Sequence, residues 1–253
     1  NENFAGTYNA YLVLTDRTEQ ATPQSMLDNE AMPASLSDWR DETLATVQDG
    51  APGEALQNLI FAIDDKLFDD LTTEETDYLD AVMAKVEAAN SQSKTFQNPE
   101  VLAYIEKLQQ TLQDSGLVGK SNALPDVVKV VNRELRSGEQ KDYALPDSSN
   151  AVAQTLLQYQ SSHRPNDLWH FVKPDYRAAL VWLQLTSGDN QDMTAVVQLV
   201  SDYIDANPLP AGIEADWAGK AYLNVVWQEN MVAGMLDSLM GAFVIVFVMM
   251  IVL

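Results

Sequence analysis

The sequence of 253 residues contains no cysteine and only two histidines, His163 and His170. Without cysteine the chain cannot form a disulfide, use a catalytic thiolate or build a cysteine-ligated zinc site. His163 lies beside Arg164 and Pro165 in an expected loop, and His170 lies between two aromatic residues, so neither histidine belongs to a catalytic or metal-binding pattern. A glycine-rich phosphate loop is also missing from the sequence. We therefore expect no enzyme activity, no bound metal and no cofactor.

Basic residues are scarce. The chain has 15 Lys and Arg against 37 Asp and Glu, which gives a formal net charge of −22. Nucleic acids and anionic lipid surfaces are bound through clustered basic residues, so both are excluded as expected partners. The acidic pairs at 64–65 and 69–70 lack the alternating ligands, central glycine and closing glutamate of a calcium loop. We interpret them as a solvated acidic face, which suits an extracytoplasmic domain or a salty habitat.

Long apolar runs are confined to the end of the chain, where residues 239–253 carry no polar side chain. A helix counted from Met231 would be about 34 Å long, close to the hydrocarbon thickness of a bilayer, which is about 30 Å. The alternative is a buried core helix, but this run is apolar on every face. The pattern predicts a transmembrane helix with Asp237 near its entry and with Tyr222 and Trp227 in the interfacial aromatic belt.

The two ends of the sequence also bear on its context. The chain starts at Asn1 without an initiator Met or a signal peptide, and its last residue, Leu253, falls inside the predicted span. Our interpretation is that the sequence is a piece of a longer membrane protein.

Two segments have the pattern of strands. Residues 8–14 (Tyr-Asn-Ala-Tyr-Leu-Val-Leu) are rich in aromatic and aliphatic side chains and predict the first strand. Residues 175–186 are apolar on both alternating sets over their middle, which is typical of a central strand covered by helices on both faces. We expect this second strand to be interior and to pair with residues 8–14.

Between these strands, residues 19–94 have a helical pattern. Thr72 and Glu75 have the spacing of a capping box, which predicts a helix start at Thr73. Apolar stripes at helical spacing predict a packed hairpin, with Leu56, Leu59, Ile60, Ile63 and Leu67 on the first helix and Leu79, Val82, Met83 and Val86 on the second. After this hairpin, Asn98-Pro99-Glu100 combines a cap residue, a proline and an acid in the first turn, which predicts another helix start.

Without its helical insertions, the chain has the order strand, helix, strand, strand, helix, strand. This order predicts an α+β fold with the split βαβ arrangement of a ferredoxin-like sandwich, interrupted after the first and second strands. A helical bundle with a small sheet is the rival fold. We expect residues 1–18 and 95–219 to form the ferredoxin-like domain, 19–94 an acidic helical insertion, and 220–253 an amphipathic lead-in followed by the transmembrane helix.

Several short segments, in colinear order, resemble one family of membrane proteins. They are 4–8 (Phe-Ala-Gly-Thr-Tyr), 98–102 (Asn-Pro-Glu-Val-Leu), 118–120 (Val-Gly-Lys), 145–148 (Leu-Pro-Asp-Ser) and 172–177 (Val-Lys-Pro-Asp-Tyr-Arg). With the membrane span after Gly219, they resemble the extracytoplasmic porter loop between the first and second membrane helices of RND superfamily exporters, in the MMPL-like branch. The resemblance covers roughly two thirds of the chain and leaves residues 19–94 outside the family pattern.

The resemblance implies a proton-driven exporter of lipids or hydrophobic compounds in the inner (cytoplasmic) membrane, with most of this chain on the periplasmic side. The proton-relay acids of the family lie on later membrane helices. The implied partners are the bilayer, a hydrophobic or lipid substrate, the remainder of the transporter chain, and a further copy or an extracytoplasmic accessory protein. The alternative hypothesis is a membrane-anchored binding or scaffold module that uses the acidic insertion as its partner surface.

Four aromatic residues are the candidates for a substrate path: Trp169, Phe171, Tyr176 and Trp182. Aromatic side chains could line a cleft for a hydrophobic substrate, but core packing or a docking surface is the more common role of such a cluster.

Overall fold

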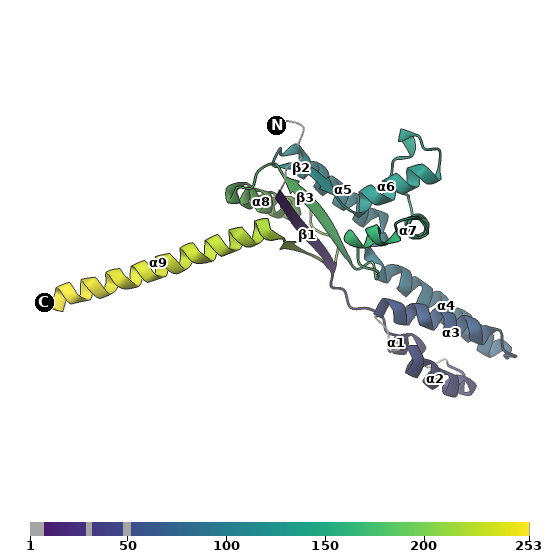
Figure 1. Ribbon diagram of the computed structural model, residues 1–253. Coiled ribbons are helices and arrows are strands. Elements are labelled where there is room, and N and C mark those ends of the chain that lie inside the picture. The colour runs from purple at the N-terminus through teal and green to yellow at the C-terminus, as the bar shows by residue number, and fades with distance from the viewer. Residues whose placement is uncertain (1–7, 29–31, 48–51, 253) are drawn as a thin grey trace.

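The computed structural model describes residues 8–28, 32–47 and 52–252, and it has an α+β architecture built on one antiparallel sheet (Figure 1). The strands are β1 (Tyr8–Asp16), β2 (Val118–Asn122), β3 (Ala178–Leu185) and β4 (Ile213–Ala218). The helices are α1 (Pro23–Leu27), α2 (Ser37–Val47), α3 (Pro52–Leu67), α4 (Thr73–Ser93), α5 (Pro99–Asp114), α6 (Leu124–Leu135), α7 (Ser149–Gln160), α8 (Asn190–Ala206) and α9 (Lys220–Val252).

The four strands lie in the order β2-β3-β1-β4, and every neighbouring pair is antiparallel. In the central pair, β1 and β3, Tyr11 lies opposite Trp182 and Leu12 opposite Val181. The prediction that the strand around residues 180–183 is interior and pairs with residues 8–14 is therefore confirmed.

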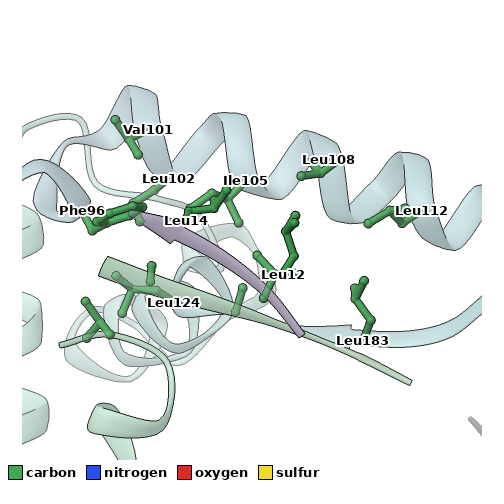
Figure 2. Packing of buried hydrophobic residues seen from close by; sticks show 14 of the residues in the cluster. Leu12, Leu14, Phe96, Val101, Leu102, Ile105, Leu108, Leu112, Leu124 and Leu183 are labelled. Atoms are coloured by element: carbon green, nitrogen blue, oxygen red, sulfur yellow. The ribbon is translucent and has the colours of Figure 1, made fainter. Parts of the chain in front are cut away.

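Helices α5 and α8 cover one face of this sheet. Pro99 stands at the first turn of α5, and the side chain of Asn98 accepts a hydrogen bond from the Glu100 N–H, so this helix starts where the sequence predicts. Figure 2 shows the apolar side of α5 lying on β1 and β3. The fully buried contacts include Leu12, Leu14, Phe96, Leu102, Ile105, Leu108, Val181 and Leu183, and Met193, Val196 and Val200 of α8 join the same core.

The opposite face of the sheet differs from what the sequence predicted. We expected helices on both faces of the strand at 175–186, but from Ala179 onward only alternate residues of β3 are buried (Ala179, Val181, Leu183 and Leu185), while Leu180 and Trp182 are half-buried. Trp182 packs beside Tyr11 of β1, with ring centroids 6.3 Å apart. Cross-strand neighbours of this kind give a sheet face part of its burial without any helix above it. The pattern therefore correctly predicted a strand, but within the described residues this strand is buried on one side only.

Replacing Phe96 by alanine tests how much the main core contributes. The Phe96 side chain is 0% exposed and lies between α5 and the sheet. Phe96→Ala should lower the free energy of unfolding by about 3–5 kcal/mol, because a large cavity replaces packed atoms. Phe61→Ala, at a residue that is 58% exposed, should change it by less than about 0.5 kcal/mol. Urea denaturation followed by tryptophan fluorescence measures both; equal effects would contradict this account of the core.

The segment between β2 and β3 contains α6, α7 and two 3-10 helices, η3 (Gln140–Asp142) and η4 (Pro165–His170). Lys129 of α6 is nearly buried and pairs with Glu106 of α5 at 2.7 Å. Its ammonium also lies 5.0 Å from the centre of the Tyr143 ring. Burial opposes the charge of Lys129, but the Glu106 hydrogen bond and nearby carboxylates outweigh it and raise the pKa of this lysine. The ion pair with Glu106 thus holds α6 against α5.

Helices α1 to α4 form a second unit with its own core. Leu27, Leu36, Leu56, Leu59, Ile63, Tyr78, Leu79, Val82 and Val86 are buried together there, separately from the residues of the main core. The predicted capping box is confirmed, since the Glu75 carboxylate accepts from the Thr72 N–H at 2.7 Å and the Thr72 hydroxyl accepts from the Glu75 N–H. A hydrogen bond from Ser35 and those from Thr72 lower the pKa of Glu75 to about 2. The predicted hairpin corresponds to α3 and α4, which pack side by side.

Candidate membrane anchor and candidate substrate-contact residues

Helix α9 contains 33 residues, which corresponds to about 50 Å at 1.5 Å per residue. It is long and apolar enough to cross a membrane, and none of its most apolar window is buried against the rest of the chain. Large side chains along it are open to the surroundings, for example Phe243 at 64%, Met250 at 69% and Ile251 at 68% exposure. Figure 1 shows α9 extending away from the sheet as a single free helix. Such a surface is far larger than the isolated apolar patches that soluble proteins usually expose.

The first turns of α9 are attached to the folded domain. Gly219, between β4 and α9, has φ +101° and lies against the Tyr11 ring, a combination that an L side chain would not tolerate. Val225 is 6% exposed and belongs to the main core, and Tyr222 stacks on Trp217 of β4 with ring centroids 6.2 Å apart. The orientation of α9 relative to the sheet is thus fixed at its base.

The three predicted membrane-interface residues fall in different environments. Tyr222 packs against the domain core, while Trp227, one and a half turns further along, is 67% exposed and precedes the apolar stretch. Asp237 lies within α9, but its side chain is outside the part of the chain that the structure describes. Of the two aromatic residues, Trp227 therefore has the geometry that an interfacial belt requires.

Three of the four candidate substrate-path residues gather at one end of β3. Trp169 meets Tyr176 edge to face, with centroids 6.2 Å apart, and Phe171 packs against the same core. Tyr176 is buried, its hydroxyl accepts from Gln160 Nε2 at 2.6 Å, and burial raises its pKa. Tyr176 is also the one described non-glycine residue with positive φ, at 54°. Tyr176 is thus part of the main core, and Trp169 and Phe171 are partly buried against it.

Trp182, the fourth candidate, points to the opposite face of the sheet and does not join the other three. Its Nε1 is buried, and the structure describes no acceptor for it. A buried donor without an acceptor costs about 1–3 kcal/mol. Together with the half-buried Tyr11, Val13 and Leu180, Trp182 forms the apolar centre of this sheet face, which we call the open sheet face.

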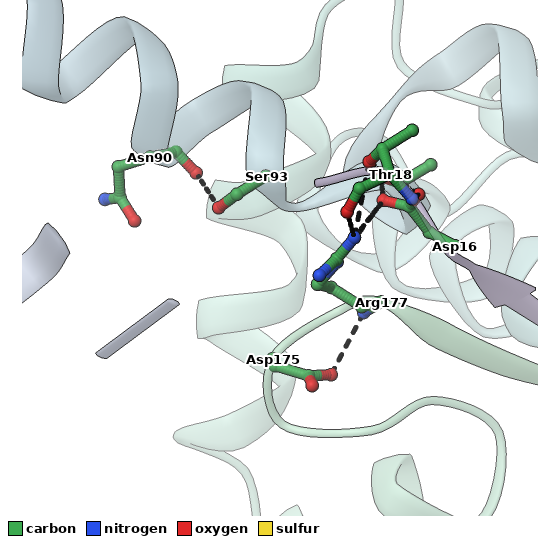
Figure 3. Close-up of polar contacts among 7 residues, drawn as sticks. Asp16, Thr18, Asn90, Ser93, Asp175 and Arg177 are labelled. Atoms are coloured by element: carbon green, nitrogen blue, oxygen red, sulfur yellow. Dashed lines mark hydrogen bonds and ion pairs between the residues drawn. The ribbon is translucent and has the colours of Figure 1, made fainter. Parts of the chain in front are cut away.

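A buried carboxylate that sequence reasoning missed lies at the end of β1. Asp16 accepts hydrogen bonds from the Thr95 hydroxyl at 2.5 Å, from the Thr18 N–H at 2.8 Å and from the Thr18 hydroxyl at 2.7 Å. Arg177 Nη2 pairs with the same carboxylate at 3.2 Å and also donates to the Thr18 carbonyl (Figure 3). Thr18 stands at the entrance of the α1–α4 unit, Thr95 at its exit and Arg177 before β3, so this cluster fixes the neck of the insertion to the sheet.

The sequence carried a weak signal for this neck cluster. Arg177 belongs to the segment 172–177, one of those that carry the family resemblance, and Asp16 is the first charged residue after the predicted strand. Nothing in their spacing links them, because 161 residues separate the two positions and only the pairing of β1 with β3 brings them together.

Asp16→Asn tests the neck cluster. Burial tends to raise the pKa of Asp16, but hydrogen bonds from Thr95 and Thr18 and the charge of Arg177 outweigh it and hold the pKa below its usual value. A lowered folded-state pKa contributes stability above the unfolded pKa of about 3.9, and this contribution is lost as the pH falls through the folded value. At pH 7 the variant should be about 1–3 kcal/mol less stable than the parent, and the gap should narrow as the pH falls below about 4. Urea denaturation from pH 7 to pH 3 measures the gap; a gap independent of pH would contradict the role of the charge.

His163 and His170 are both exposed, and the Nδ1 of His170 lies 3.3 Å from the Asp167 carbonyl oxygen. Among the described residues, no group of three or more acidic, histidine or cysteine side chains could hold a metal ion.

Comparisons with known protein families, with curated proteins and with solved structures give no match to this chain.

Proposed function

We propose that this chain is an extracytoplasmic porter domain of an RND-type, MMPL-like exporter, which uses the proton gradient to move lipids or other hydrophobic compounds out of the cell. In this proposal α9 is the second membrane helix of the transporter, in the inner membrane, and the sheet with its helices stands in the periplasm. The remainder of the transporter would supply the proton pathway.

A ferredoxin-like core is part of the proposal. Its support is the order β1, α5, β2, β3, α8, β4 combined with the sheet order β2-β3-β1-β4 and antiparallel pairing throughout. This combination fits the split βαβ arrangement that we propose, with α1–α4 inserted after the first strand and α6–α7 after the second.

The observation that carries the proposal is the direct passage from the last strand into α9. Gly219 alone separates β4 from a helix that is long and apolar enough to cross a membrane, and Val225 anchors the base of that helix in the domain core. A domain joined rigidly to a membrane helix can transmit movement between the two, as a transporter requires. A flexible linker would serve an anchor equally well, but it could not transmit such movement.

The open sheet face is the proposed contact surface for the substrate or for the rest of the transporter. Trp182, Tyr11 and Leu180 offer half-buried apolar area there. Of the four aromatic candidates, Trp182 is therefore the one that we assign to the substrate path.

The test uses the complete protein in sealed vesicles with an imposed proton gradient and a fluorescent lipid as cargo. Gradient-dependent movement of the lipid, abolished by a protonophore, is the expected result. Trp182→Ala should slow it about tenfold, the effect of losing about 1.4 kcal/mol. Phe68→Ala, at a residue that is 84% exposed on the insertion, is the matched control and should leave the rate unchanged. A rate of lipid movement that does not depend on the proton gradient would contradict the exporter assignment.

A membrane-anchored binding module is the second candidate. The separate core of α1–α4 favours it, because a unit that packs independently can present a partner surface without any transport. An absence of gradient-driven transport, together with partner binding at α1–α4, would favour this candidate.

A further inference from the structure

Helices α2 and α3 enclose a groove on the outside of the insertion. It has a volume of about 680 Å³, and its floor and walls include Trp39, Thr43, Val47, Phe61 and Ala62. Phe61 is 58% exposed, although the neighbouring turns of α3 bury Leu59 and Ile63 completely. Trp39 packs in part against the second core and Val47 is buried, so Phe61 is the large apolar side chain that the described lining of the groove leaves exposed.

The rim of this groove is acidic. Glu42, Asp65 and Asp69 line it, and Lys66, the one basic residue among the lining residues that the structure describes, donates to Asp69 at 2.8 Å. Within the described residues, Glu42 and Asp65 have no ion-pair partner. An apolar floor between unneutralised carboxylates is complementary to an amphipathic helix with a basic outer face.

The groove also lies far from the expected membrane. Figure 1 shows α1–α4 and α9 leaving the sheet in opposite directions, so the acyl chains around α9 could not reach the groove. A second copy of this chain, with a net charge of −22, would bring like charge to the acidic rim.

We propose that the α2–α3 groove binds a basic amphipathic helix of another extracytoplasmic protein. Its apolar side would lie on Phe61 and Trp39, and its lysines or arginines would meet Glu42 and Asp65. This recognition follows the helix-in-groove mode and goes beyond the proposed transport function.

The probe is a designed Leu/Lys peptide of about 14 residues, or about four helical turns, with a photoreactive leucine on its apolar side. The protein is the full chain in phosphatidylcholine nanodiscs, with empty discs as the blank. We expect saturable binding that weakens with salt, and crosslinks to residues 39–47 and 58–69. Phe61→Ser should weaken binding about tenfold, whereas Phe68→Ser, outside the groove lining, should not.

A charge-matched pair of variants separates the groove from general acidity. Glu42→Gln with Asp65→Asn should weaken binding several-fold and reduce its salt dependence. Asp77→Asn with Asp80→Asn removes the same charge from the exposed side of α4 and should leave binding nearly unchanged. Equal losses of binding in the two pairs of variants would overturn the proposal. So would crosslinks to α9 or to the disc, or a dimer that forms without peptide and that Phe61→Ser dissociates.

Discussion

Cutting the chain after Gln228 is expected to move it completely from the membrane fraction to the soluble fraction, as a monodisperse monomer. The cut removes the open apolar surface of α9 but keeps Val225 in the core and Tyr222 on Trp217. Burying such apolar surface is favourable by about 25 cal/mol per Å², so the intact helix has a strong drive to leave water. Carbonate extraction and size-exclusion chromatography without detergent measure the change.

A shorter variant that ends at Gly219 is the control. From the sequence alone, Gly219 is the natural boundary, and the structure moves it, because residues 220–228 cover part of the main core. The shorter variant should also be soluble but less stable by about 1–3 kcal/mol, the cost of losing a buried Val and the aromatic stack. Full-length chain that stays in solution without detergent would contradict a membrane role for α9.

Replacing residues 19–94 by a short Gly/Ser linker is expected to leave one cooperative unfolding transition in the remaining chain. The two ends of the insertion are already close, because the hydroxyls of Thr18 and Thr95 both donate to the Asp16 carboxylate. The buried residues of α1–α4 form their own cluster, so their removal opens no cavity in the main core. Loop closure adds little, since its entropy changes only slowly with loop length.

Thermal unfolding followed by circular dichroism, on the deletion variant cut after Gln228, measures this. A matched variant that also carries Asp16→Asn should unfold at a lower temperature, because the neck cluster then lacks its charge. Loss of the cooperative transition in the deletion variant alone would show that the insertion is integral to the main core, and would count against the porter-domain proposal.

The sequence was informative where one local pattern decides the structure. Aromatic and aliphatic content predicted β1, and apolarity on both alternating sets of residues predicted β3. The Asn98-Pro99 start and the Thr72–Glu75 capping box predicted the starts of α5 and α4. The pairing of β1 with β3 also followed, because the expected strand order placed these two strands next to each other.

The rest depends on contacts between distant segments. The sequence shows that both faces of β3 are apolar. It does not show whether a helix covers the face that carries Leu180 and Trp182. The binding of Asp16 to Arg177 and Thr95 needs the sheet to exist first. Tyr222 is of a residue type that is common in the interfacial belt. Because it lies only one turn after β4, however, its side chain packs on Trp217 and the core. The groove at Phe61 likewise arises only when α2 packs beside α3.

The central claim, a folded domain outside the membrane on a helix that spans it, is tested most directly by single-cysteine labelling. The chain has no cysteine of its own, so Ser201→Cys on the exposed side of α8 and Ile245→Cys in the apolar run at 239–253 of the sequence each add one thiol to it. The reagent is a maleimide too polar to cross the cytoplasmic membrane, applied to cells that make the complete protein, with labelling of the parent subtracted. We predict that Ser201→Cys reacts in intact cells and that Ile245→Cys reacts only after detergent is added. Labelling of Ile245→Cys without detergent, or labelling of Ser201→Cys only in inverted vesicles, would contradict the account.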